Sequence, residues 1–179
     1  MWGFLYIRYM KTGFLLLLLF AGISAHAQDE FASTTFYNAI KKVRADSQTG
    51  FEQLKGNILQ TPFADIRKEY RVKFMLPLAD SGKIVIPAAG SPFAVYFFEA
   101  EKKKENINER AVSLREAIVA SHGEPLYTRT ISTTVKEEIH SDTYFYTDPE
   151  ETHTSKALFR TTIYKQKKRY HLSFEIRGN

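Results

Sequence analysis

The stretch HSDTYFYTDPEETHTS, from His140 to Ser155, concentrates residue types able to do chemistry. Its sixteen positions hold two histidines, four carboxylates and three aromatic rings. A metal site needs ligands that converge from a rigid frame, such as two histidines one helical turn apart or alternating on a strand. His140 and His153 are instead thirteen positions apart and flank an acidic, proline-containing turn at residues 148–151. The spacing predicts a strand at residues 144–146 that runs into a polar turn, and no metal site.

Other combinations of reactive residues are also incomplete. Ser121 precedes His122, but adjacent residues of a helix point about 100° apart, so a serine and its base cannot meet there. The sequence has no Gly-x-Ser-x-Gly turn, no phosphate-binding glycine loop and no dinucleotide fingerprint. It also has no cysteine, which excludes disulfides, thiolate metal sites and cysteine nucleophiles. These features predict a protein that is not an enzyme and that has no cofactor.

The N-terminus has the pattern of a secretory signal. Arg8 and Lys11 precede an apolar run at residues 13–21, and Ala25-His26-Ala27 supplies the small-x-small pattern of a cleavage site. We therefore expect residues 1–27 to be a signal peptide that is removed after Ala27, with Met10 as an alternative start of the chain. An uncleaved membrane anchor is the alternative interpretation.

Cleavage after Ala27 would leave a chain of the size of one ordinary domain. Residues 28–179 are 152 residues, and loss of Arg8 and Lys11 lowers the formal charge from +5 to +3. This charge is too mild and too evenly spread to predict nucleic-acid binding. A lipoprotein signal needs a cysteine and is excluded. We expect a periplasmic or secreted bacterial protein without an integral membrane span after signal cleavage.

The first half of the mature chain, about residues 28–100, reads as a helix followed by strands. Residues 33–35 can cap a helix whose apolar stripe holds Phe36, Ile40 and Val43. Residues 51–56 are predicted to form one more helical turn, closed by glycine. Strands are expected at residues 70–76, 83–86 and 93–99, with a turn at residues 80–82.

The second half, about residues 101–179, repeats this order. A highly charged run at residues 101–105 is predicted to be a solvated linker into a helix that Asn106 or Asn108 caps. The helix is expected to end at Gly123 and to bury Val112, Leu114, Ile118 and Val119. Four strands should follow, at residues 126–135, 143–147, 157–164 and 169–176. In the last, the predicted apolar side holds Tyr170, Leu172, Phe174 and Ile176, and the polar side holds Arg169, His171, Ser173 and Glu175.

These elements predict an α+β fold in which helices pack on one face of an antiparallel sheet. We expect residues 28–179 to form a single exported domain. The order of elements is compatible with two helix-plus-sheet halves in tandem, although the two halves share no sequence repeat.

Two resemblances accompany this pattern. Phe51-x-x-Leu54-Lys55-Gly56, followed by strands and a Leu76-Pro77 step, resembles a group of small secreted bacterial proteins that carry no assigned chemistry. The repeated helix-plus-sheet order is similar to the architecture of β-lactamase-inhibitory proteins, which bind partners with the open face of a sheet. The second resemblance implies partner binding through a sheet face, by analogy of fold alone.

The strand at residues 93–98, FAVYFF, is apolar on both faces. If Phe93, Val95 and Phe97 contact the helices, the alternate residues emerge on the opposite face of the sheet. Tyr144 and Tyr146 share a parity on another strand, and tyrosine suits a surface that is both apolar and hydrogen-bonding. The predicted partner-binding surface therefore consists of Tyr96, Phe98, Tyr144 and Tyr146. The alternative is that a loop or the other half of the domain covers this face.

Three functions remain compatible with the sequence. The leading hypothesis is an exported, non-enzymatic domain that binds a protein or other macromolecule of the cell envelope. The second is a carrier of a small ligand or lipid, which would need an apolar pocket between the helices and the sheet. The third is a cell-envelope hydrolase, which would need two acids converging in a cleft.

Overall fold

The computed structural model describes residues 30–135 and 138–178. The chain divides into two units, residues 1–30 and 31–179, and the fold below is that of the second unit. The predicted signal peptide lies outside the described residues. Within the described part of the chain, no helix has the length and apolar character needed to cross a membrane.

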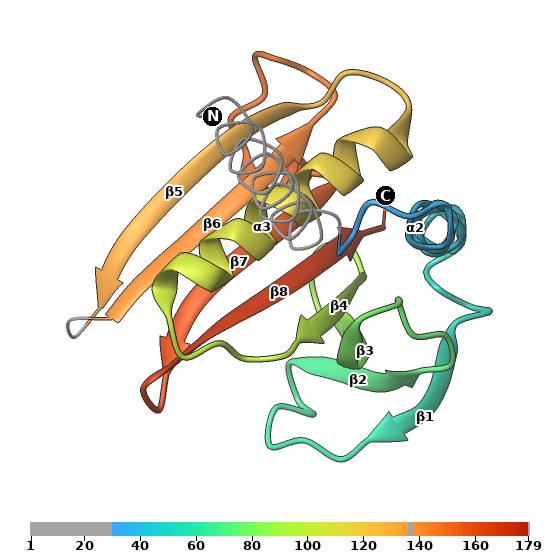
Figure 1. Ribbon diagram of the computed structural model, residues 1–179. Coiled ribbons are helices and arrows are strands. Elements are labelled where there is room, and N and C mark those ends of the chain that lie inside the picture. Colours follow the sequence, from blue (N-terminus) through green and yellow to red (C-terminus); the bar gives the residue numbers. More distant parts are fainter. Residues whose placement is uncertain (1–29, 136–137, 179) are drawn as a thin grey trace, which may run out of the picture. The chain divides into compact units, whose positions relative to one another are not determined.

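Two α-helices and one eight-stranded sheet make up the described second unit, together with a short 3₁₀ helix (Figure 1). This architecture confirms the predicted α+β class. In chain order the elements are α2 (Thr34–Ser47), β1 (Lys55–Leu59), β2 (Arg67–Val72), β3 (Ala79–Pro87), β4 (Phe93–Phe98), α3 (Lys104–His122), β5 (Tyr127–Val135), β6 (Glu138–Tyr146), η1 (Thr154–Lys156), β7 (Phe159–Gln166) and β8 (Arg169–Arg177).

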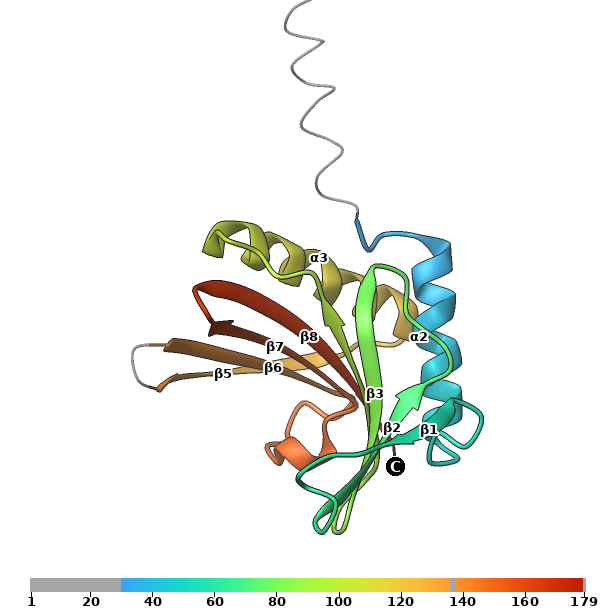
Figure 2. The same cartoon turned by 90° about the horizontal axis from the view of Figure 1, so that it is seen from below.

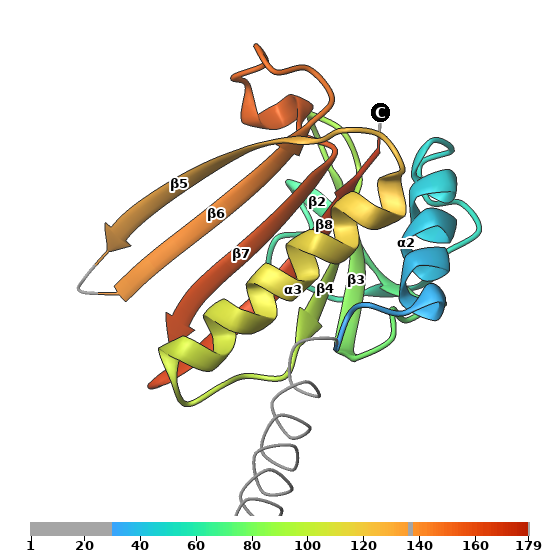
Figure 3. The same cartoon turned by 45° about the horizontal axis from the view of Figure 1, so that its top comes forward.

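The sheet is antiparallel throughout, and from each edge inward the strands follow in chain order. The order is β1-β2-β3-β4-β8-β7-β6-β5, so the fourth strand of each half pairs with the other in the middle. Both helices pack on the same face of this sheet (Figures 2 and 3). The α3 helix contacts β7 and β8, whereas α2 contacts β8 and β4. The helices thus cover the junction between the two halves.

The α2 helix forms as the sequence predicts, but the segment after it does not. Ser33 caps the helix, because its Oγ accepts a hydrogen bond from the Phe36 backbone N–H at 3.1 Å. At its C-terminal end, the Asp46 carboxylate accepts hydrogen bonds from the backbone N–H groups of Gln53 and Leu54. These bonds fix a non-helical turn, and β1 begins directly after it at Lys55. The predicted helical turn at residues 51–56 is therefore wrong.

The α3 helix ends where glycine predicts but buries a different stripe. Gly123 has φ +81° and caps the helix as expected, whereas the helix begins at Lys104, before either asparagine. Leu114 and Ile118 are buried, as predicted. Val112 and Val119 are 49% and 40% exposed, so their predicted burial is wrong. The buried stripe of the helix includes Ile107, Ala111, Leu114 and Ile118. Val112 comes one position after Ala111 and Val119 one position after Ile118, so each side chain points about 100° away from the stripe.

The turn predicted at residues 80–82 lies inside β3. The chain actually reverses before it, between β2 and β3, where Leu78 has φ +66°. Gly82 serves packing and not a turn, because a Cβ atom there would lie 2.8 Å from Cδ1 of Tyr96. The glycine makes room for a tyrosine ring on the neighbouring strand.

That ring shows which face of β4 meets the helices. Ala94, Tyr96 and Phe98 belong to the core on the helix face, and Tyr96 is fully buried. Tyr96 pairs across the sheet with Phe174, and its hydroxyl donates a hydrogen bond to the Phe74 carbonyl at 3.2 Å. Burial raises the pKa of this phenol. The prediction that Tyr96 and Phe98 lie away from the helices is therefore wrong; the alternate residues Phe93, Val95 and Phe97 occupy that side.

We expect Tyr96→Ala to lower the free energy of unfolding by about 3–5 kcal/mol, because it would leave a cavity in the core. Phe97→Ala, on the same strand but with a half-exposed side chain, should cost less than about 2 kcal/mol. Urea unfolding of the two variants measures the difference. Equal losses would contradict the assignment of the two faces.

Candidate functional site

The face of the sheet opposite the helices, here called the open face, carries three distinct groups of side chains along β6, β7 and β8. Strand pairing places them in successive rows. At one end, the loop at residues 147–158 lies against the sheet (Figure 2). Charged side chains occupy the middle, and half-buried rings occupy the other end. Of these groups, only one that is accessible can bind a partner.

Tyr144 and Tyr146 lie under the loop. They form a small cluster with Ala157 of that loop and are only 8% and 3% exposed. Arg177 Nη1 donates to the Thr154 carbonyl at 2.8 Å, which ties the loop to the sheet. Burial raises the pKa of both tyrosines. A loop therefore covers these two residues, as the alternative interpretation anticipated.

The four residues predicted to bind a partner do not form one surface. Tyr96 and Phe98 lie in the core on the helix face, and Tyr144 and Tyr146 lie beneath a loop on the open face. None of the four is more than 8% exposed.

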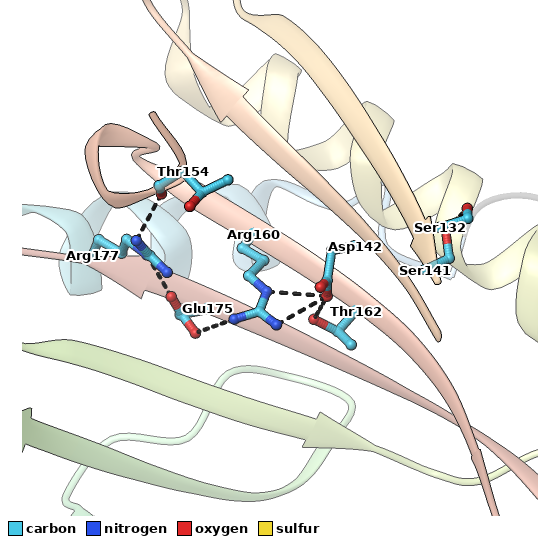
Figure 4. A network of polar contacts seen from close by, with 8 residues as sticks. All are labelled: Ser132, Ser141, Asp142, Thr154, Arg160, Thr162, Glu175 and Arg177. Carbon is cyan, nitrogen blue, oxygen red and sulfur yellow. Dashed lines mark hydrogen bonds and ion pairs between the residues drawn. The ribbon is translucent and has the colours of Figure 1, made fainter. Parts of the chain in front are cut away.

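The middle of the open face is an ion network around Arg160 (Figure 4). Its Nε and Nη2 atoms lie 3.1 and 3.0 Å from Oδ1 of Asp142, which also accepts a hydrogen bond from Thr162 Oγ1. Its Nη1 atom lies 3.7 Å from Oε2 of Glu175, whose other oxygen pairs with Arg177. Burial lowers the pKa of Arg160, but the neighbouring carboxylates raise it more, so the net shift is upward. The network joins three strands.

The pairing of the carboxylates in this network indicates a structural role and not acid–base chemistry. Asp142 and Glu175 converge on the Arg160 guanidinium, and Glu175 also pairs with Arg177, so two cations balance the two carboxylates and hold them in place. Within the described residues, no three side chains of the histidine, cysteine, aspartate or glutamate type gather closely enough to hold a metal ion. His153 is exposed on the loop, away from the row that contains His140.

The far end of the open face carries a cluster of half-buried rings, here called the ring patch and consisting of Phe97, His140, Tyr164 and His171. The Tyr164 ring stacks on His171 with centroids 5.0 Å apart and meets His140 edge-on at 6.0 Å. Both contacts follow from strand register, since Tyr164 pairs with His140 on one side and His171 on the other. Phe97 lies diagonally from His171 across the β4–β8 pair. The stacked rings support one another in an accessible position.

A basic hairpin tip adjoins the ring patch. The turn between β7 and β8 consists of Lys167 and Lys168, flanked by the paired residues Gln166 and Arg169. Both lysines have positive φ, +50° and +65°, and both are exposed. A two-residue hairpin turn of this kind favours Asn-Gly, because left-handed backbone is costly for residues with a Cβ atom. The sequence predicted the reversal here but not this conformation.

Sequence reasoning missed the ring patch because its members come from four strands. The one signal available was the assignment of His171 to the polar side of its strand, which the structure confirms. No spacing along the chain links His171 to Tyr164, His140 or Phe97. The register between paired strands brings these residues together, and register depends on residues that are distant in the sequence.

Comparison of the chain with protein-family models, with curated proteins and with solved structures finds no match.

A second buried acid on the open face allows a test by pH. Glu69 is 4% exposed and pairs with Lys83 Nζ and Arg67 Nε, both at 2.7 Å. Burial raises the pKa of Glu69, but the hydrogen bond and charge of Lys83, together with Arg67, lower it more, so the net pKa is below its ordinary value. The pairing therefore stabilises the fold fully above the ordinary pKa and is lost as the pH falls through the lowered folded-state pKa.

We expect Glu69→Gln to cost about 1.5–3 kcal/mol of unfolding free energy near pH 7. The difference in unfolding free energy between wild type and this variant should shrink as the pH is lowered from about 5 to about 3, because the wild-type carboxylate is then protonated. Urea unfolding at several pH values measures this. Glu116→Gln, at an exposed position of α3, is the matched control and should stay within about 0.5 kcal/mol throughout. A difference that does not change with pH would contradict the ion-pair explanation.

Proposed function

We propose that this is an exported, non-enzymatic protein that binds a protein or other macromolecule of the cell envelope through the ring patch and the adjoining basic tip. The observation that carries the proposal is the stacked row of His140, Tyr164 and His171, whose rings are partly exposed on the open face. The tyrosines at the other end of that face are already covered by a loop of the chain itself and are not accessible to a partner.

Stacked rings suit the role of a binding surface. Aromatic side chains offer large contact areas at little cost in conformational entropy, and they are enriched where partners meet. Tyr164 is held between two rings, so its position is fixed before a partner arrives. Histidine and tyrosine also keep polar atoms for hydrogen bonds at the rim.

The basic tip indicates the charge of the partner. Lys167 and Lys168 occupy backbone conformations that cost about 1–2 kcal/mol per residue relative to glycine. Residues in costly conformations often belong to functional sites. Two lysines at this position, next to Arg169, favour a partner that presents acidic groups to the ring patch.

We expect the double substitution Lys167→Asn and Lys168→Gly to raise the unfolding free energy by about 1–2 kcal/mol, because the new pair prefers this turn. The same protein should bind its partner more weakly, since the tip loses both charges. Urea unfolding and a binding measurement on one preparation test the two effects together. A stabilised variant with unchanged binding would remove the tip from the binding surface.

Capture from envelope extract, with mature protein as bait and mass spectrometry as readout, tests the ring patch. Tyr164→Ala should lose the partner that wild type retains, because truncation of an aromatic anchor commonly weakens binding thirtyfold or more, about 2 kcal/mol. Tyr127→Ala is the matched control: Tyr127 is 45% exposed and lies on β5, opposite Tyr146 at the loop-covered end. Loss of the partner in both variants, or in neither, would contradict the assignment.

Export supplies a separate test. The basic start, the apolar run and Ala25-His26-Ala27 support removal of the first 27 residues. We expect N-terminal sequencing of the exported protein to begin near Gln28. A mature form that still begins at Met1 or Met10 would contradict export by cleavage.

A further inference from the structure

A cavity of about 320 Å³ lies on the helix face, between the C-terminal halves of α2 and α3. Its walls include Ile40 and Ala45 of α2, and Phe159 at the start of β7 contributes from the sheet. This volume is at the lower end of the range of small-molecule sites, which is about 300–1,000 Å³. The cavity is separate from the ring patch, which is on the open face.

The charged lining of the cavity is entirely basic. Lys41, Arg44 and His122 are among its eight lining residues, and none of the eight is acidic. Arg44 Nη1 donates to Ser47 Oγ at 2.9 Å and to the Arg177 carbonyl at 2.8 Å, so its guanidinium is fixed in position. Lys41 is exposed, which leaves its ammonium able to reach over the cavity.

His122 adds a polar atom whose hydrogen bonding is incomplete. Its ring meets Phe159 edge-on at 5.9 Å, and its Nε2 atom is buried without a hydrogen-bond partner in the described part of the chain. Because this nitrogen is buried, a ligand in the cavity does not reach it, and the positive charge of the lining comes from Lys41 and Arg44. The helix ends act in the opposite sense, because the C-terminal ends of α2 and α3 carry partial negative charge. The basic side chains outweigh this partial charge, so a cationic ligand does not fit the lining.

We propose that this cavity binds a small monocarboxylate with an aromatic or branched aliphatic body. The body packs on Ile40, Ala45 and Phe159, and the carboxylate lies toward Lys41 and Arg44. This site does not depend on the proposed partner binding at the ring patch, so either assignment can fail without the other.

Three probes of the same shape but different charge test the ligand class. Benzoate, benzamide and benzamidine carry a negative charge, no charge and a positive charge, and titration calorimetry with the mature protein measures each. Saturable binding in the order benzoate, benzamide, benzamidine is expected. Absence of saturable benzoate binding at millimolar concentration overturns the site, and equal or tighter binding of benzamidine overturns its anion preference.

Variants then locate the site. Ala45→Phe fills the cavity and should abolish benzoate binding while the helix is retained. Lys41→Gln should weaken binding about fivefold, as for an exposed charge. Lys42→Gln is the matched control, because Lys42 lies over the Phe74 ring, does not line the cavity, and should leave the affinity unchanged. Equal effects of the two lysine variants overturn a local role for Lys41.

His122→Phe separates binding from stability. Phenylalanine keeps the edge-on contact with Phe159 and removes the unpaired nitrogen, so the melting temperature should stay level or rise. Benzoate affinity should stay unchanged, because the buried Nε2 atom makes no contact with the ligand. A clear loss of benzoate affinity in this variant overturns the placement of the carboxylate at Lys41 and Arg44.

Discussion

The antiparallel pairing of β4 with β8 joins the two helix-plus-sheet halves, and Tyr96 lies at its centre. Its ring faces Phe174 on one neighbouring strand and Gly82 on the other, and its hydroxyl reaches the Phe74 carbonyl. Both helices pack over this junction, through α2 on β4 and β8 and α3 on β8. If the junction opened, each half would expose a long unpaired strand in place of a continuous sheet. The positions of the helices, and the face left open, follow from this one pairing.

The same pairing explains where sequence reasoning succeeded and where it failed. In β8, apolar and charged residues alternate, so the side that holds Phe174 was predicted correctly. In β4 the side chains on both faces are apolar. The sequence pattern therefore predicts a strand but does not show which of its faces lies in the core. Once Tyr96 is known to pair with Phe174, it must share the core side. That information lies about eighty residues away in the chain. The α2 cap at Ser33 and the α3 stop at Gly123 were predictable because each depends only on its immediate neighbours.

The stretch from His140 to Ser155 shows why a concentration of reactive residues is not in itself a site. Alternation along β6 gives its members unrelated surroundings: His140 joins the ring patch, Asp142 joins the ion network, and Tyr144 and Tyr146 lie under the loop. Each of these groups is completed by β7 or by the loop, from residues that are distant in sequence. The sequence predicted an aromatic surface of the sheet, but none of its four predicted members belongs to the ring patch.

Strand β7 contributes to both candidate sites, with Phe159 at the cavity and Tyr164 in the ring patch. Two ligands influence each other only if each distinguishes between two arrangements of the protein. β7 is hydrogen-bonded on both sides along its length, by β6 and by β8, which leaves it little freedom to shift. A ligand between α2 and α3 would instead act on the spacing of the two helices, which contact each other and the sheet without being part of its strand pairing. The sheet thus separates the two faces energetically, and the free-energy coupling between a carboxylate in the cavity and a partner at the ring patch should be close to zero.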